Sequence, residues 1–104
     1  MILTTCDTVP GREIDSTLGL CRGSAIRARH VGKDILAGLK NIVGGEMHEY
    51  SKLLAETREQ ALDRMVEDAR TKGADAVVAI RYASTAISQG AAEFLAYGTA
   101  VKLA

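Results

Sequence analysis

The stretch that decides the fold is KGADAVVAIRY, at residues 72–82. Its glycine, Gly73, follows a long helical pattern, and a glycine in this place ends a helix in the left-handed conformation. Residues 76–80 are then apolar at every position, on both parities of a strand. A strand with two apolar faces is buried on both of them. The stretch therefore predicts a helix that ends at Gly73 and leads into a strand covered on both sides.

The preceding helix is predicted to run from residue 46 to residue 72, a length of about 40 Å at 1.5 Å per residue. Opposite charges four residues apart, such as Asp68 and Lys72, stabilise its solvent-exposed side. A shorter helix is expected between Asp34, as N-cap, and Gly44. The apolar residues of the long helix recur at helical spacing and form one stripe: Met47, Tyr50, Leu54, Ala61, Met65 and Ala69.

Strand patterns occupy residues 2–5, 12–28, 76–87 and 93–103. In the second of these, Ile14, Leu18, Leu20 and Ile26 share one parity, and the glycines of the other parity allow a bend or a close backbone approach. The pattern predicts an α+β domain of two layers over residues 1–104, with an antiparallel sheet packed on one long helix. One helix covers one face of a sheet, so a neighbouring subunit is expected to cover the other.

Composition supports the expectation of an oligomer. The chain has no Trp, one Phe and three Tyr in 104 residues, so its core has few large side chains. A domain of this size buries only about two thirds of the surface that its unfolded chain exposes. Burial against further copies of the chain would compensate for this thin core.

Charge and hydropathy exclude several classes of protein. Thirteen basic and thirteen acidic residues leave a formal net charge of zero, which argues against general nucleic-acid or membrane binding. No apolar run approaches the roughly 20 residues of a membrane span, and MILTTCDTVP lacks the basic start and long apolar stretch expected of a signal peptide. The expected location is cytoplasmic, where cysteines stay reduced.

Several separated motifs resemble one known family. DILAGLKNIVGG, EYSKLLAETREQALDRM, KGADAVVAIRY and a terminal GTAV occur in the order seen in the YbjQ-like proteins, small proteins also described as "putative heavy-metal-binding" domains. The resemblance covers essentially the whole chain. It implies a dodecin-like subunit and a ring-like homopentamer, sometimes a decamer of two stacked rings, with edge strands joining neighbours. It carries no ligand motif that transfers to numbered residues.

The metal-ligand candidates are Cys21 and Cys6, which could bind a soft transition metal such as zinc or copper. Glycines on both sides of Cys21 leave room beside its sulfur, and copies of it could meet around an oligomer axis. Structural zinc sites pair cysteines at much closer spacing. The alternative is that both cysteines are small, semi-buried apolar residues.

A second candidate site is basic and contains Arg27, Arg29, His30 and Lys33, with no acid between Arg27 and Lys33. A ring would multiply this patch and could attract an anionic ligand. The alternative is that these residues pair with acids of a neighbouring subunit. Catalytic motifs are missing, since Ser24 lies in RGSA and not in G-x-S-x-G. The sequence thus favours a non-enzymatic ring that binds a small ligand or ion at its interfaces or axis, with cysteine-based heavy-metal binding as the alternative.

Overall fold

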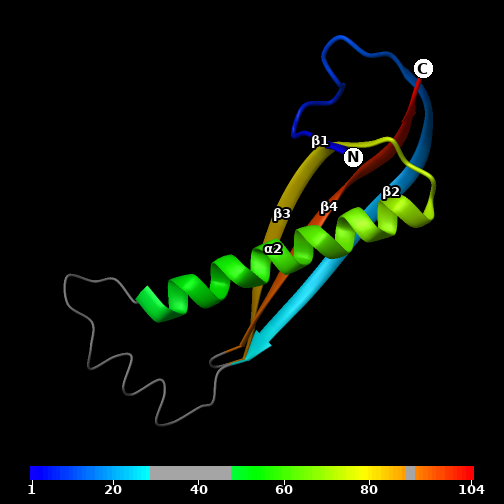
Figure 1. Ribbon diagram of the computed structural model, residues 1–104. Coiled ribbons are helices and arrows are strands. Elements are labelled where there is room, and N and C mark those ends of the chain that lie inside the picture. The colour runs from blue at the N-terminus through cyan, green and yellow to red at the C-terminus, as the bar shows by residue number, and fades with distance from the viewer. Residues whose placement is uncertain (29–47, 89–90) are drawn as a thin grey trace.

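The computed structural model describes residues 1–28, 48–88 and 91–104 (Figure 1). The predicted helix after Asp34, and the glycine pair that follows it, lie outside these residues. The described elements, in chain order, are β1 (Ile2–Leu3), β2 (Ile14–Ala28), α2 (His48–Thr71), β3 (Ala76–Ser88) and β4 (Ala91–Leu103).

The sheet has four strands in the order β1-β3-β4-β2. β4 pairs antiparallel with β2 on one side and with β3 on the other, whereas β1 runs parallel to β3. The sheet is therefore mixed, and the prediction of an antiparallel sheet is wrong for β1. Two parallel strands need a long connection between them, and here β2 and α2 lie between β1 and β3 in the chain.

The helix ends where the sequence predicted. Gly73 follows α2 with a φ of +78°, the left-handed conformation that a glycine adopts without a steric penalty. In this last turn Lys72 Nζ lies 2.8 Å from Asp68 Oδ1, so the predicted pair four residues apart is present. Among the described residues α2 is the one helix, and it has no apolar stretch long enough to cross a membrane.

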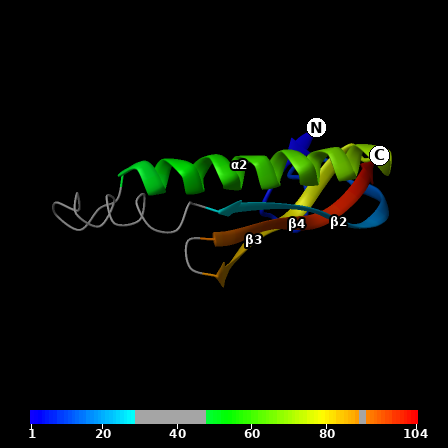
Figure 2. The same cartoon turned by 90° about the horizontal axis from the view of Figure 1, so that it is seen from below.

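The main core lies between α2 and one face of the sheet (Figure 2). The helix buries Ala61, Met65 and Ala69 completely, and burying a side chain such as Met65 stabilises the fold by about 1.5–3 kcal/mol. The contact is close, because a Cβ added to Gly23 of β2 would lie 2.2 Å from the backbone nitrogen of Met65. The predicted close backbone approach at a β2 glycine is confirmed.

A second, smaller core lies on the opposite face at one end of the sheet. There Val9 is buried against Val78 and Val101, with Ala76 in the same cluster. The N-terminal segment (residues 4–11) brings Val9 to this place, because it runs beside β3. Backbone hydrogen bonds from Thr4 N to Val77 O, from Ile80 N to Thr4 O and from Ala79 N to Cys6 O hold it there.

Candidate functional site

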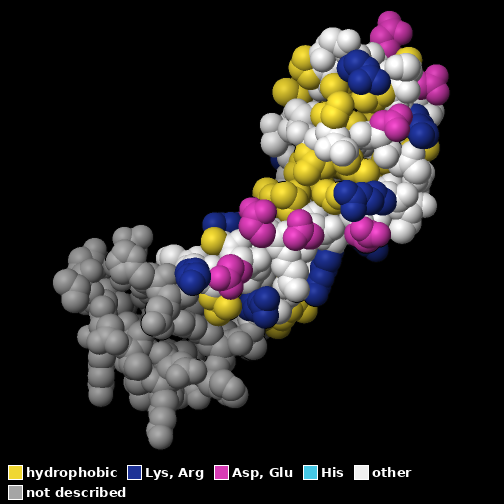
Figure 3. Space-filling model, in the orientation of Figure 1, with side chains coloured by type: hydrophobic (Ala, Val, Ile, Leu, Met, Phe, Trp, Pro, Cys, Tyr) yellow, Lys and Arg dark blue, Asp and Glu magenta, His cyan; other side chains and the backbone are white. Residues whose placement is uncertain are grey.

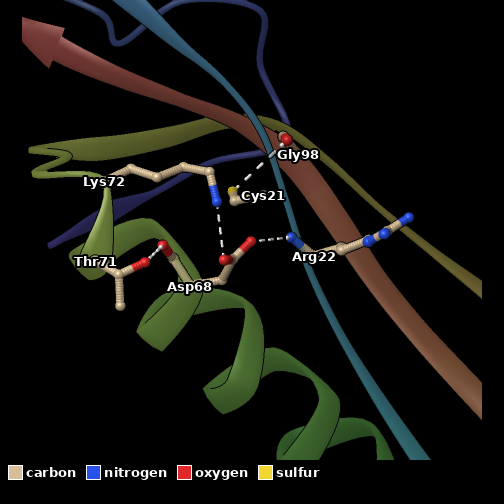
Figure 4. A network of polar contacts seen from close by, with 6 residues as sticks. All are labelled: Cys21, Arg22, Asp68, Thr71, Lys72 and Gly98. Carbon is tan, nitrogen blue, oxygen red and sulfur yellow. Dashed lines mark hydrogen bonds and ion pairs between the residues drawn. The ribbon is translucent and has the colours of Figure 1, made fainter.

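Cys21 lies in β2, fully buried beneath α2. Its thiol donates a weak hydrogen bond to the carbonyl oxygen of Gly98, at 3.6 Å (Figure 4). Burial raises the pKa of the Cys21 thiol, and the nearby carboxylate of Asp68 raises it further. The side chain is therefore a neutral thiol in the core, and a metal ion could reach its sulfur only if α2 or the sheet moved.

Cys6 is exposed on the N-terminal segment, on the far side of β3 from Cys21. β4 and β3 lie between the two cysteines, so three interstrand spacings separate them, about 14 Å. One chain therefore does not bring the two thiols together. The described residues also contain no cluster of three or more His, Cys, Asp or Glu side chains that could hold a metal. The assignment of these cysteines to a metal site stays a prediction.

Arg27 lies near the end of β2, where its Nη2 donates to Gln60 Oε1 at 3.3 Å. Arg29, His30 and Lys33 lie outside the described residues, so the predicted basic patch stays a prediction. The surroundings of Arg27 are of mixed charge, and Figure 3 shows basic and acidic side chains interspersed along this face of α2. Arg27 borders a shallow groove of about 450 Å³, whose other lining residues are Ala55, Glu56, Arg58, Glu59, Gln60 and Asp63.

The outer edge of β2 is closed by side chains of α2. Asp68 Oδ2 accepts a hydrogen bond from the backbone N–H of Arg22 at 3.0 Å, and Arg64 Nη1 donates to the carbonyl of Ser24 at 2.6 Å. The hydrogen bond from Lys72 and then that from Arg22 hold the pKa of the Asp68 carboxyl below its usual value. Figure 4 shows Asp68 between these two donors, with the Arg22 side chain pointing away from it.

The outer edge of β3 is open over most of its length. β1 pairs only with Ala76 and Val77, and the N-terminal segment extends this contact only as far as Ile80. Beyond it, residues 81–87 are all exposed, and β4, on the inner side, is the only described strand that pairs with them (Figure 1). A free strand edge presents unpaired N–H and C=O groups that another strand can bind.

Two large apolar side chains of β2 lie on the face of the sheet that points away from α2. On β2, Leu20 and Ile26 are 58% and 59% exposed on this face, while the buried Cys21 and Ala25 point toward α2. The sequence pattern identified both parities but did not show which one faces the helix.

The middle of this open face has one row of three residues that the sequence analysis did not select. Tyr97 of β4 stands directly opposite Arg22 of β2 and Arg81 of β3. Directly opposite residues in neighbouring strands point to the same face. Only the strand register shows this row, because its members are far apart in sequence.

Comparison with known proteins agrees with this fold. The chain is 59% identical to a UPF0145 protein of Methanosarcina acetivorans over 99% of this chain and 97% of that one, and 56% identical to one of Archaeoglobus fulgidus over 99% and 95%. A crystal structure from Pediococcus pentosaceus, of unknown function and of the DUF74 family, matches with a TM-score of 0.71 over 100% of this chain and 98% of that one, at 14% identity. The model of the YbjQ-like family, described as "Putative heavy-metal-binding", matches residues 1–104. The chain therefore belongs to the YbjQ-like family.

Proposed function

We propose that this protein is a non-enzymatic subunit of a ring-shaped homopentamer, which binds a small ligand or ion where its subunits meet. The observation that carries the proposal is the open face of the sheet, where Leu20 and Ile26 are more than half exposed. Large apolar side chains on the exposed face of a sheet are typical of a surface that binds a partner. A second copy of the chain would bury them and complete the thin core.

The two edges of the sheet support the same proposal. Asp68 and Arg64 bind the outer edge of β2 at Arg22 and Ser24, whereas no described strand lies along the outer edge of β3 from residue 81 onward. Natural proteins usually protect an edge with charges, prolines or a covering element, and residues 82–87 contain no charged residue and no proline. The edge of β3 is thus suited to a joint between copies. A contact between this edge and a different surface of the next copy would form a ring when the rotation closes.

Native mass spectrometry and sedimentation velocity test the assembly directly. For five chains of 11.1 kDa we expect a complex of about 56 kDa. Leu20→Glu on the open face and Thr85→Lys on the β3 edge should each dissociate it. Ser51→Lys, on the exposed side of α2, should leave it intact. A wild-type chain that sediments as a monomer at micromolar concentration would contradict the proposal.

A second candidate function, heavy-metal binding through cysteine thiolates, is supported by the family's description and by the exposure of Cys6. In a ring, Cys6 thiols of several copies would be the accessible ligands for zinc or copper, which prefer sulfur. Elemental analysis of freshly purified, tag-free protein should then find metal that Cys6→Ser removes. The same substitution at the buried thiol, Cys21→Ser, serves as the matched comparison. Metal-free protein whose thiols react equally fast with and without added zinc or Cu(I) would exclude this candidate.

A further inference from the structure

We infer that the row Arg22–Tyr97–Arg81 on the open face of the sheet binds a small aromatic molecule that carries a phosphate or carboxylate group. The inference rests on the proposed function, because it names a ligand class and the residues for a site that a neighbouring copy would cover. This site is separate from the predicted basic patch, whose described member, Arg27, lies near the end of β2.

The register places the three side chains on one face. Arg22 and Arg81 both stand opposite Tyr97, so their backbones are two interstrand spacings apart, about 10 Å. Both arginines are exposed, and Tyr97 between them is partly buried. Figure 4 shows the Arg22 side chain extending away from α2 and Asp68. Two arginines thus stand on either side of one tyrosine in the strand register, all three within the described residues.

Arg81 is held in place by the N-terminal segment. Its Nη1 donates to the carbonyl oxygens of Thr5, at 3.0 Å, and of Ile80, at 2.8 Å. Within the described parts of the chain, its Nη2 and Nε make no hydrogen bond. A guanidinium that is positioned through one nitrogen and open at the others can bind an anion with less loss of side-chain entropy.

The surroundings of the row suit the aromatic group of a ligand as well as its negative charge. Leu20 lies one row away on β2, and Leu95 lies on the other side of Tyr97 on β4. Ligand sites combine such apolar walls with a few polar groups that fix orientation. The nearest acid of this face along β4 is Glu93, whose Oε2 accepts a hydrogen bond from Ser24 Oγ at 2.9 Å, so its carboxylate lies beside β2 two residues along from Arg22. The two arginines of the row outnumber this one carboxylate, in a chain of zero net charge.

The two arginines and the tyrosine between them favour an aromatic anion over an acidic side chain of a neighbouring copy. Arginine pairs bind carboxylate and phosphate through parallel hydrogen bonds, and a tyrosine ring adds stacking with a planar partner. An acidic side chain would use the two arginines but not the ring between them.

The test is isothermal titration calorimetry of the full chain at low salt, with AMP, adenosine and inorganic phosphate as probes. AMP should bind at least tenfold more tightly than either adenosine or phosphate. Arg22→Gln and Arg81→Gln should each weaken AMP binding at least tenfold, and Tyr97→Leu should weaken AMP binding but not phosphate binding. Arg70→Gln, on the exposed side of α2, should change nothing. Since Arg81 also holds the N-terminal segment, Arg81→Lys provides a variant that keeps the charge, and AMP binding to it should fall between wild type and Arg81→Gln.

Sedimentation of the same samples separates this inference from the proposed function. If wild-type chains form rings that bind none of the probes at millimolar concentration, or that bind AMP equally well after Arg22→Gln and Arg81→Gln, the inference is wrong and the assembly stands. If these two substitutions dissociate the ring and no probe binds, the arginines pair with acids of a neighbour, which also overturns it. A monomeric wild type that binds AMP through Arg22 and Arg81 would support the site and contradict the ring.

Discussion

Replacing Gly23 by alanine tests how closely α2 lies on the sheet. The added methyl carbon would be 2.2 Å from Met65 N, 2.3 Å from Ala61 O and 2.6 Å from Arg64 C. All three are backbone atoms of the helix, so no side chain can rotate away to make room. An ordinary contact needs about 3.4 Å or more, and α2 must therefore move outward by more than about 1 Å.

The cost of this movement follows from the contacts that it loosens. A gap of about 0.5–1 Å forfeits a quarter to a half of the dispersion energy of the contacts across it. A buried side chain the size of Met65 makes about 40–60 contacts of about 0.1 kcal/mol each, so this residue alone would lose roughly 1–3 kcal/mol. Because Ala61 and Ala69 share the interface, we expect Gly23→Ala to destabilise the fold by about 3 kcal/mol. The melting temperature should then fall by about 12 °C or more.

Thermal and urea unfolding, followed by circular dichroism at 222 nm and at matched protein concentration, measure the loss. Gly19→Ala is the comparison, since nothing lies within 4 Å of its added methyl group. Its φ of +106° still makes alanine unfavourable there, by about 1–2 kcal/mol. Met65→Ala should not rescue Gly23→Ala, because the clash is with backbone. A Gly23→Ala protein within about 0.5 kcal/mol of wild type would show that α2 does not lie this close to β2.

Three further predictions concern the backbone of β3, the last turn of α2 and the thiols. Ala79 has a φ of +54°, a left-handed conformation that is strained for alanine. Ala79→Gly should therefore raise the free energy of unfolding, measured in urea, by about 0.5–1 kcal/mol, and a loss of stability would show that this backbone is not strained. The lowered pKa of Asp68 contributes stability that is present above its ordinary value of 3.8 and is lost as the pH falls through the lower, folded value. Asp68→Asn should therefore flatten the dependence of melting temperature on pH below about 4, and an unchanged acid slope would refute this. With Ellman's reagent, one thiol should react fast and one slowly in the native protein, and Cys6→Ser should remove the fast phase. A fast phase that persists in Cys6→Ser and disappears in Cys21→Ser would reverse the assignment.

The sequence predicts the elements of this fold well. The long helix was expected at residues 46–72 and is found at His48–Thr71. The second strand was expected at residues 12–28 and is found at Ile14–Ala28. Both predictions rest on long periodic patterns, and Gly73 gives the helix an unambiguous end. The direction of β1 was not predictable in this way, because a strand of two residues has no pattern that distinguishes parallel from antiparallel pairing.

The orientation of β2 shows where periodicity is insufficient. The general rule places the larger apolar side chains in the core, which would turn Leu20 and Ile26 toward the helix. The structure does the opposite, because α2 approaches β2 so closely at Gly23 that only small residues such as Cys21 and Ala25 fit between them. The distance between two elements is not encoded in either element's own pattern. The site candidates depend on it, because it buries Cys21 and leaves Leu20 and Ile26 exposed.

The edges of the sheet explain why the open surfaces adjoin one another. Asp68 pairs with Lys72 as predicted, but Asp68 and Arg64 also bind backbone groups of β2 that are 46 and 40 residues away. The helix that covers one face of the sheet thus also binds part of one of its edges. Among the described residues, the surfaces left for a partner are the part of the opposite face that Val9 does not cover and the edge of β3, and Arg81 belongs to both. A partner that approached from this side could therefore bury the apolar face, pair with the free edge and close over the Arg22–Tyr97–Arg81 row in one interface.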